Sequence, residues 1–130
     1  MGVAQVILER LAQAGIVHGS PVNAAHLADL MSHAVAASEG VGDWTLVQRL
    51  DGGDLLPSDI ARWAMALLRS DQMAEVLWVP QRFAVTASTH AVLSRLDDLW
   101  YPGPDDLWME GRDWGLLIDH NEIASFFNKD

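Results

Sequence analysis

The sequence predicts an α+β domain in which N-terminal helices pack with a small C-terminal antiparallel β-meander. In the first half of the chain, apolar residues recur every three or four positions, as on the buried face of an amphipathic helix. After the Tyr101–Pro104 bend they alternate nearly every second position, as in strands with one buried face. With 130 residues, half of them hydrophobic, the chain fits one globular domain over residues 1–130.

The first two helices are expected at 3–14 and 21–38. Apolar residues at helical spacing fill both segments, and Gly15 ends the first. Ser20 can cap the second helix, and Pro21 suits its first position because the missing N–H costs no hydrogen bond there. A loop rich in glycine follows the second segment.

The middle of the chain predicts two more helices and a turn. A helix is expected at 57–69, where a proline opens the segment and an acidic residue lies near its positive dipole end. The spacing of three apolar residues in 43–50 favours a short helix over a strand: Trp44, Val47 and Leu50. Asp71 is expected to cap a short turn that runs to Leu77.

The back of the chain predicts mostly strands. Residues 83–86 fit a strand, and Ser88 or Thr89 can cap a helix that runs through Leu99. Two prolines in the Tyr101–Pro104 bend fix φ and remove helix donors. Short turns then separate the three strands expected in the meander: 106–110, 114–119 and 123–127.

The tryptophans fall into two groups by context. Three lie among apolar residues and are expected in the core: Trp44, Trp63 and Trp78. Trp108 and Trp114 flank the first hairpin of the meander, and two interpretations stay open for them. They pack as a cross-strand pair that serves the structure, or they lie on the surface as contact residues.

Negative charge is concentrated at the C-terminal end. Residues 97–130 contain nine acidic and two basic residues, so they hold −7 of the chain's net charge of −10, and they contain three of the six tryptophans. Such a surface is typical of a face that binds a basic protein, because aromatics supply contact area and charges accelerate association. The expected partner-binding residues are Asp97, Asp98, Trp100, Tyr101, Asp105, Asp106, Trp108, Glu110 and Asp113.

Composition excludes several other classes of protein. One lysine and seven scattered arginines, with a pI near 4.6, argue against binding to nucleic acid or to anionic membranes. The absence of cysteine excludes disulfides and thiolate metal sites. No apolar run is long enough to span a bilayer, and Met1–Gln5 lacks the basic start of a secretory signal. A cytoplasmic protein is expected, for which solubility alone would also explain the acidity.

Two groups of polar residues contain the residue types that bind metal ions. His26 and His33 share one helix face, with Asp29 between them, but seven residues separate the histidines by about 10 Å along the axis, too far for one zinc ion. The doublets at 97–98 and 105–106 allow three interpretations: turn or cap residues, the rim of a partner site, or a site for a hard cation. EF-hand spacing is absent, and neither a metal nor a cofactor is predicted.

The alternative function is a small enzyme or ligand-binding domain with a pocket near Asp119, His120 and Glu122. A histidine flanked by carboxylates has the composition of a general base. Neighbouring side chains in a strand point to opposite faces, however, and the last residues of the cluster fit a turn. Catalysis is therefore not the expected role.

Two segments carry a resemblance to a known class of proteins. Leu99–Trp108 contains a Trp-Tyr-Pro bend and an Asp-Asp pair, and Asp113–His120 adds a short strand. The C-terminal quarter resembles that of small bacterial immunity-type proteins, cytoplasmic partners that neutralise toxins of interbacterial competition. Such proteins differ in fold and share no catalytic residues, so the resemblance implies only a function, the non-enzymatic neutralisation of a toxin. The acidic surface predicts that this toxin is basic.

Overall fold

The computed structural model describes residues 2–53, 55–100 and 106–130. In chain order its elements are α1 (Val3–Gln13), α2 (Ala24–Glu39), β1 (Trp44–Leu50), α3 (Pro57–Leu68), β2 (Met73–Trp78), β3 (Phe83–Ser88), α4 (Thr89–Ser94), α5 (Leu96–Leu99), β4 (Leu107–Glu110), β5 (Trp114–Ile118) and β6 (Ala124–Lys129). This is the predicted α+β class. No helix in the described ranges is both long and apolar enough to cross a membrane.

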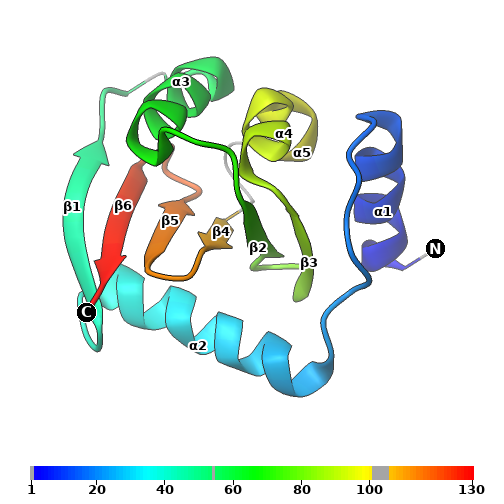
Figure 1. Ribbon diagram of the computed structural model, residues 1–130, viewed down its shortest axis with the longest axis horizontal. Coiled ribbons are helices and arrows are strands. Elements are labelled where there is room, and N and C mark those ends of the chain that lie inside the picture. The colour runs from blue at the N-terminus through cyan, green and yellow to red at the C-terminus, as the bar shows by residue number, and fades with distance from the viewer. Residues whose placement is uncertain (1, 54, 101–105) are drawn as a thin grey trace.

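The molecule has three layers. A six-stranded antiparallel sheet, ordered β1-β6-β5-β4-β2-β3, lies between α2 on one side and the other helices on the opposite side (Figure 1). The larger apolar cluster joins α1, α3, α4 and α5 to one face of the sheet. The smaller cluster joins α2 to the other face. Both faces of the sheet are therefore covered, and burial of these faces is the main stabilising term.

The three long helices confirm the sequence prediction to within a few residues. The largest difference is at α2, which begins at Ala24 and not at Pro21. Its N-cap is Asn23, whose side-chain oxygen accepts the backbone N–H of His26 at 2.8 Å. Residues 16–22 are instead extended beside β3.

Residues 43–50 contain β1, so the predicted short helix is wrong. A bulge shifts the register with β6 between Leu46 and Gln48. Because an extra residue reverses the alternation of side chains, Trp44 packs in the cluster beneath α2 while Leu50 packs on the α3 side. The bulge thus places apolar residues at intervals of three, which imitates helical spacing.

The turn predicted at 71–77 is also wrong, because Met73–Trp78 is the strand β2, paired with β3 and β4. Asp71 does cap an element, but a different one. Its carboxylate accepts the backbone N–H of His90 at 3.1 Å and the hydroxyls of Ser88 and Thr89, at the start of α4. These bonds lower the pKa of Asp71, the Ser88 hydroxyl contributing most.

The C-terminal meander is confirmed as β4, β5 and β6, and it joins a wider sheet than expected. Trp108 and Trp114 are both buried, but they belong to the clusters on opposite faces of that sheet. They do not form a cross-strand pair, since the register partner of Trp108 is Leu117. The predicted bend at 101–104 lies outside the described residues.

Candidate functional site

The predicted partner-binding residues that the structure describes lie on β4, next to its two ends, and on or beside α5. Asp106 precedes β4, whereas Glu110 ends that strand and Asp113 follows it. The four-residue strand separates the two ends by about 13 Å at the usual rise per residue. Asp97 and Asp98 are exposed on α5. Two further predicted residues, Tyr101 and Asp105, lie outside the described residues.

The tryptophans predicted to contact a partner are in the core. Trp100 and Trp108 both have 0% of their surface exposed. The Trp108 ring meets Trp44 edge-on at 5.2 Å between centroids and lies 6.2 Å from the Phe127 ring. As folded, Trp100 and Trp108 therefore cannot supply contact area to a partner. Tyr101, the third aromatic that the sequence suggested, lies outside the described residues.

Asp106 organises the turn between β5 and β6. One of its carboxylate oxygens accepts the backbone N–H of His120 at 2.7 Å and lies 3.0 Å from Nδ1 of the same residue. The carboxylate of Asp119 accepts the N–H groups of Asn121 and Ile123. The cluster at 119–122, which only the alternative function used, thus mainly forms hydrogen bonds that shape the turn. The His120 side chain is 55% exposed.

The contact with Asp106 raises the pKa of His120, mainly through the hydrogen bond and then through charge. The stabilisation from this contact is therefore complete below the usual pKa of 6.5, and it is lost as pH rises through the folded-state pKa.

We expect Asp106→Asn to lower the pKa of His120, while the amide oxygen of the new asparagine still accepts the backbone N–H of His120. An NMR titration of the imidazole measures this. Asp119→Asn is the control, with a smaller downward shift, because Asp119 acts only through space; equal shifts would contradict the assignment.

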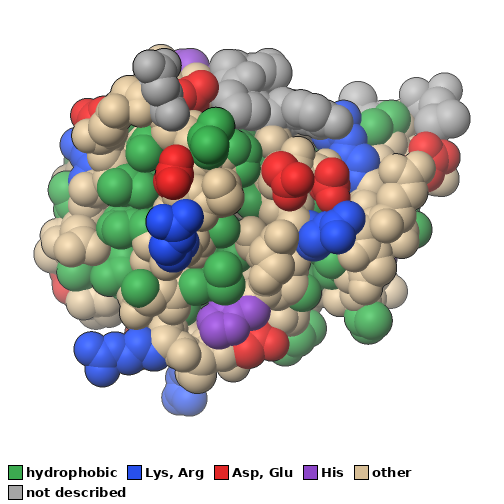
Figure 2. Space-filling view, turned by 90° about the horizontal axis from the view of Figure 1, so that it is seen from above, with side chains coloured by type: hydrophobic (Ala, Val, Ile, Leu, Met, Phe, Trp, Pro, Cys, Tyr) green, Lys and Arg blue, Asp and Glu red, His purple; other side chains and the backbone are tan. Residues whose placement is uncertain are grey.

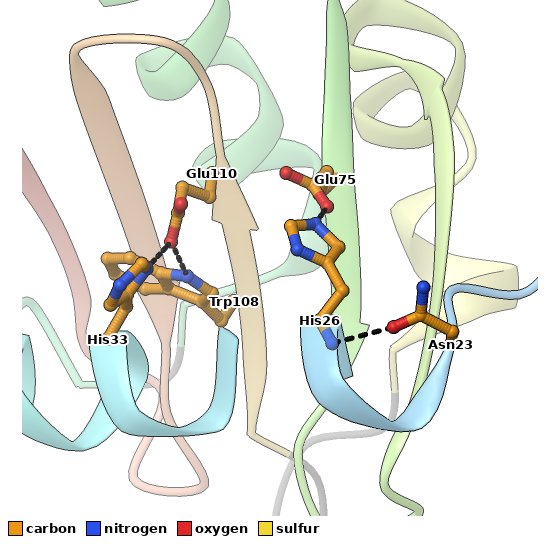
Figure 3. A network of polar contacts seen from close by, with 6 residues as sticks. All are labelled: Asn23, His26, His33, Glu75, Trp108 and Glu110. Carbon is orange, nitrogen blue, oxygen red and sulfur yellow. Dashed lines mark hydrogen bonds and ion pairs between the residues drawn. The ribbon is translucent and has the colours of Figure 1, made fainter. Parts of the chain in front are cut away.

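Two histidines of α2 bind two glutamates of the sheet (Figure 3). His26 Nε2 contacts a carboxylate oxygen of Glu75 on β2, and His33 Nδ1 lies 2.8 Å from Oε1 of Glu110 on β4. Trp108 Nε1 donates to the same Glu110 oxygen at 3.1 Å. The two histidines thus contact different carboxylates. Glu75 was not among the residues that the sequence indicated as functional.

The two glutamates are direct register partners across β2 and β4. Like charges placed opposite each other destabilise a sheet, and each carboxylate has a histidine beside it. Burial raises the pKa of Glu75 most, the Glu110 charge raises it further, and His26 opposes both. The arrangement attaches α2 to the sheet at two points. Within the described residues, no group of three or more His, Asp or Glu side chains is placed to hold a metal ion.

A cavity of about 740 Å³ opens between α3 and the α4–α5 pair. Figure 2 views the molecule from this helical side, where hydrophobic side chains are interspersed with acidic and basic ones. The cavity is lined mainly by apolar residues, with two serines and two charged side chains: Leu56, Pro57, Ser58, Ala61, Arg62, Met65, Leu93, Ser94, Leu96 and Asp97. This lining does not include Asp119, His120 or Glu122, around which the alternative function placed a pocket.

The chain was compared with protein-family models, curated proteins and solved structures, and none of them matches it.

Proposed function

We propose that this chain is a non-enzymatic, cytoplasmic protein-binding domain that binds and neutralises a basic protein, in the manner of immunity-type inhibitors. The proposal is carried by the surplus of surface carboxylate that the fold does not use. The chain has 18 acidic residues and 8 lysines or arginines. Carboxylates can occupy a site built for phosphates, so a nuclease toxin is the kind of partner that suits this charge.

The described ion pairs consume little of the negative charge. Asp98 pairs with Arg95 at 2.8 Å, and Asp59 approaches Arg62 at 3.9 Å; the other pairs use histidine. Asp97 and Asp113 are exposed, and no ion pair or hydrogen bond of their carboxylates is found among the described residues. Such charges cost no desolvation in the free protein, and they steer a basic partner during encounter.

The first experiment is functional. The product of the gene adjacent to the one that encodes this chain is expressed in cells with and without this chain, and growth of the cells is measured.

We then expect the double variant Asp97→Asn with Asp113→Asn to slow association with that product by about three- to tenfold at low salt, because rim charges act on encounter. The difference should shrink as ionic strength rises, since screening then acts within roughly 8 Å. Surface plasmon resonance at two salt concentrations measures it.

The matched control is Glu9→Gln with Asp29→Asn, which removes two exposed carboxylates from the N-terminal half of the chain. It should leave the association rate nearly unchanged. The single variants Asp97→Asn and Asp113→Asn show which acidic group meets the partner. An uncharged or acidic partner, bound at a rate indifferent to salt, would refute the proposal and leave the acidity as a solubility feature.

A further inference from the structure

The two edges of the sheet differ in whether another segment pairs with them. Along β3, Gly19 donates its N–H to Thr86 O at 2.9 Å and Val22 donates to Ala84 O at 3.0 Å, while His18 forms a bridge with Ala87. The segment 16–22 therefore covers that edge. At the opposite edge lies β1 (Figure 1), and no backbone group of the described residues hydrogen-bonds to its outer side.

The register shows which groups of β1 face outward. Lys129 on β6 donates its N–H to Asp113 O, on the side away from β1. Along an antiparallel strand, successive residues point their backbone N–H and C=O groups alternately to one side and to the other. The residues opposite Lys129 and Phe127 therefore direct their own N–H and C=O groups away from β6. Those residues are Trp44 and Leu46. The regular part of β1, before the bulge, thus directs backbone donors and acceptors away from β6, where no described backbone group pairs with them.

Two of the exposed side chains of this edge are apolar. Leu46 is 45% exposed and Val47 is 50% exposed. Arg49 is the single charged residue within the strand, and its Nε donates to Ser125 at 3.1 Å. An open edge with free backbone groups is a template for another strand, and proteins that do not use such an edge usually cover it or place charge on it.

We propose that β1 is the docking strand for the partner, and that an extended basic segment of the partner adds to the sheet along this edge. This inference rests on the proposed function. Acidic residues flank the edge: Asp43 and Asp130 are joined by a backbone hydrogen bond at one end, and Asp51 follows β1 at the other. Main-chain hydrogen bonds would supply affinity, and contacts with alternate side chains would supply selectivity.

Charge selects a foreign basic strand over a second copy of this chain. If two copies paired antiparallel about Val47, Asp43 of one copy would stand opposite Asp51 of the other, and each copy carries a net charge of −10. Lys129, whose Nζ lies 5.7 Å from the centroid of the Trp44 ring, is already counted in this net charge. A segment with alternating lysine and valine would instead place cations near the flanking carboxylates.

The test uses the ¹⁵N-labelled full chain and three synthetic peptides: acetyl-KVKVKVK-amide, its acidic counterpart acetyl-EVEVEVE-amide, and the proline-interrupted acetyl-KVKPKVK-amide. The basic peptide should bind, shift the amide signals of β1, and slow hydrogen exchange at Trp44 and Leu46. The acidic peptide should not bind. The proline peptide should bind at least about tenfold more weakly, because proline cannot donate to the ladder.

Two variants of one exposed position sharpen the result. Leu46→Lys and Leu46→Glu remove the same apolar contact, but only lysine repels a basic strand, so it should weaken binding about tenfold more than glutamate does. Val17→Lys is the control, since Val17 is 88% exposed and lies in the segment that covers the opposite edge. Peptide-induced shifts confined to α2 or to the α3–α5 cavity, equal binding of the acidic peptide, or dimerisation through β1 would overturn the inference.

Failure of the docking-strand proposal can be distinguished from failure of the proposed function. If the adjacent gene product binds wild-type protein and Leu46→Lys with equal affinity, the docking strand is wrong while the function stands. If no basic partner is neutralised, the function itself is wrong. Folding of each variant is checked by its amide spectrum before binding is measured.

Discussion

Trp108→Ala is expected to lower the free energy of unfolding by about 3–5 kcal/mol, the usual cost of removing a large buried aromatic. Its ring is completely buried, and packs edge-on against Trp44. The substitution also removes the indole N–H that donates to Glu110. Because a domain of this size is typically stable by only about 5–15 kcal/mol, the variant should unfold at much lower urea concentration.

Urea denaturation followed by circular dichroism measures this effect. Trp63→Ala is the matched control, because Trp63 is half-buried on α3 and its indole N–H donates to Gln48 at 3.0 Å. We expect it to cost clearly less than Trp108→Ala. A loss below about 1 kcal/mol at Trp108, with a native amide spectrum, would show that its ring is not a core element and would restore it as a contact residue.

The elements predicted correctly are those that local sequence determines. The long helices follow from apolar spacing together with local signals, such as Pro57 at the first turn of α3 and Ser88, whose hydroxyl accepts the N–H of Ala91 at 3.1 Å in α4. The meander follows from alternation, because its three strands are consecutive in the chain and join through short turns.

The elements predicted wrongly depend on distant partners. The strand β1 pairs with β6 from the far end of the sequence, and its bulge removes the alternation that would have identified it. The strand β2 lies between β3 and β4 and is buried along most of its length, so its sequence lacks the alternation of a half-exposed strand. Long-range pairing, and not local preference, selects the structure of both segments.

The same distinction applies to the candidate site. The acidic surplus could be counted from the sequence, but its division between the two ends of β4 required the register of the meander. His26 and Glu75 are 49 positions apart and meet only because α2 crosses the sheet. Burial of Trp108 was left open by the sequence, since aromatics beside acids suit both a surface and a core. Helix α2 packs over the face of the sheet that carries Trp108, and this packing places the ring in the core.

Gly115→Ala is expected to destabilise the protein by about 3 kcal/mol or more, although it adds a single methyl group. A Cβ atom at this position would lie 2.2 Å from Cη2 of Trp108, closer than any real contact. The ring cannot move aside cheaply, because Trp44 and Phe127 pack against it. Forcing a methyl group into a filled core usually costs about 1–3 kcal/mol, and this clash is at the severe end. Glycine is needed here for close approach of a ring to the strand.

Two controls isolate the clash in urea denaturation. Gly19→Ala should change stability little, because its Cβ would lie 3.8 Å from Cβ of Thr86, an ordinary contact. In a Trp108→Phe background, which lacks the outer atoms of the indole, Gly115→Ala should cost markedly less than in the wild-type protein. Neighbouring residues that compete for one space are non-additive by about 0.5–3 kcal/mol, so the double variant should be more stable than the sum of the single effects predicts. Strict additivity would mean that the loss at Gly115 arises from the backbone of β5 and not from the Trp108 ring.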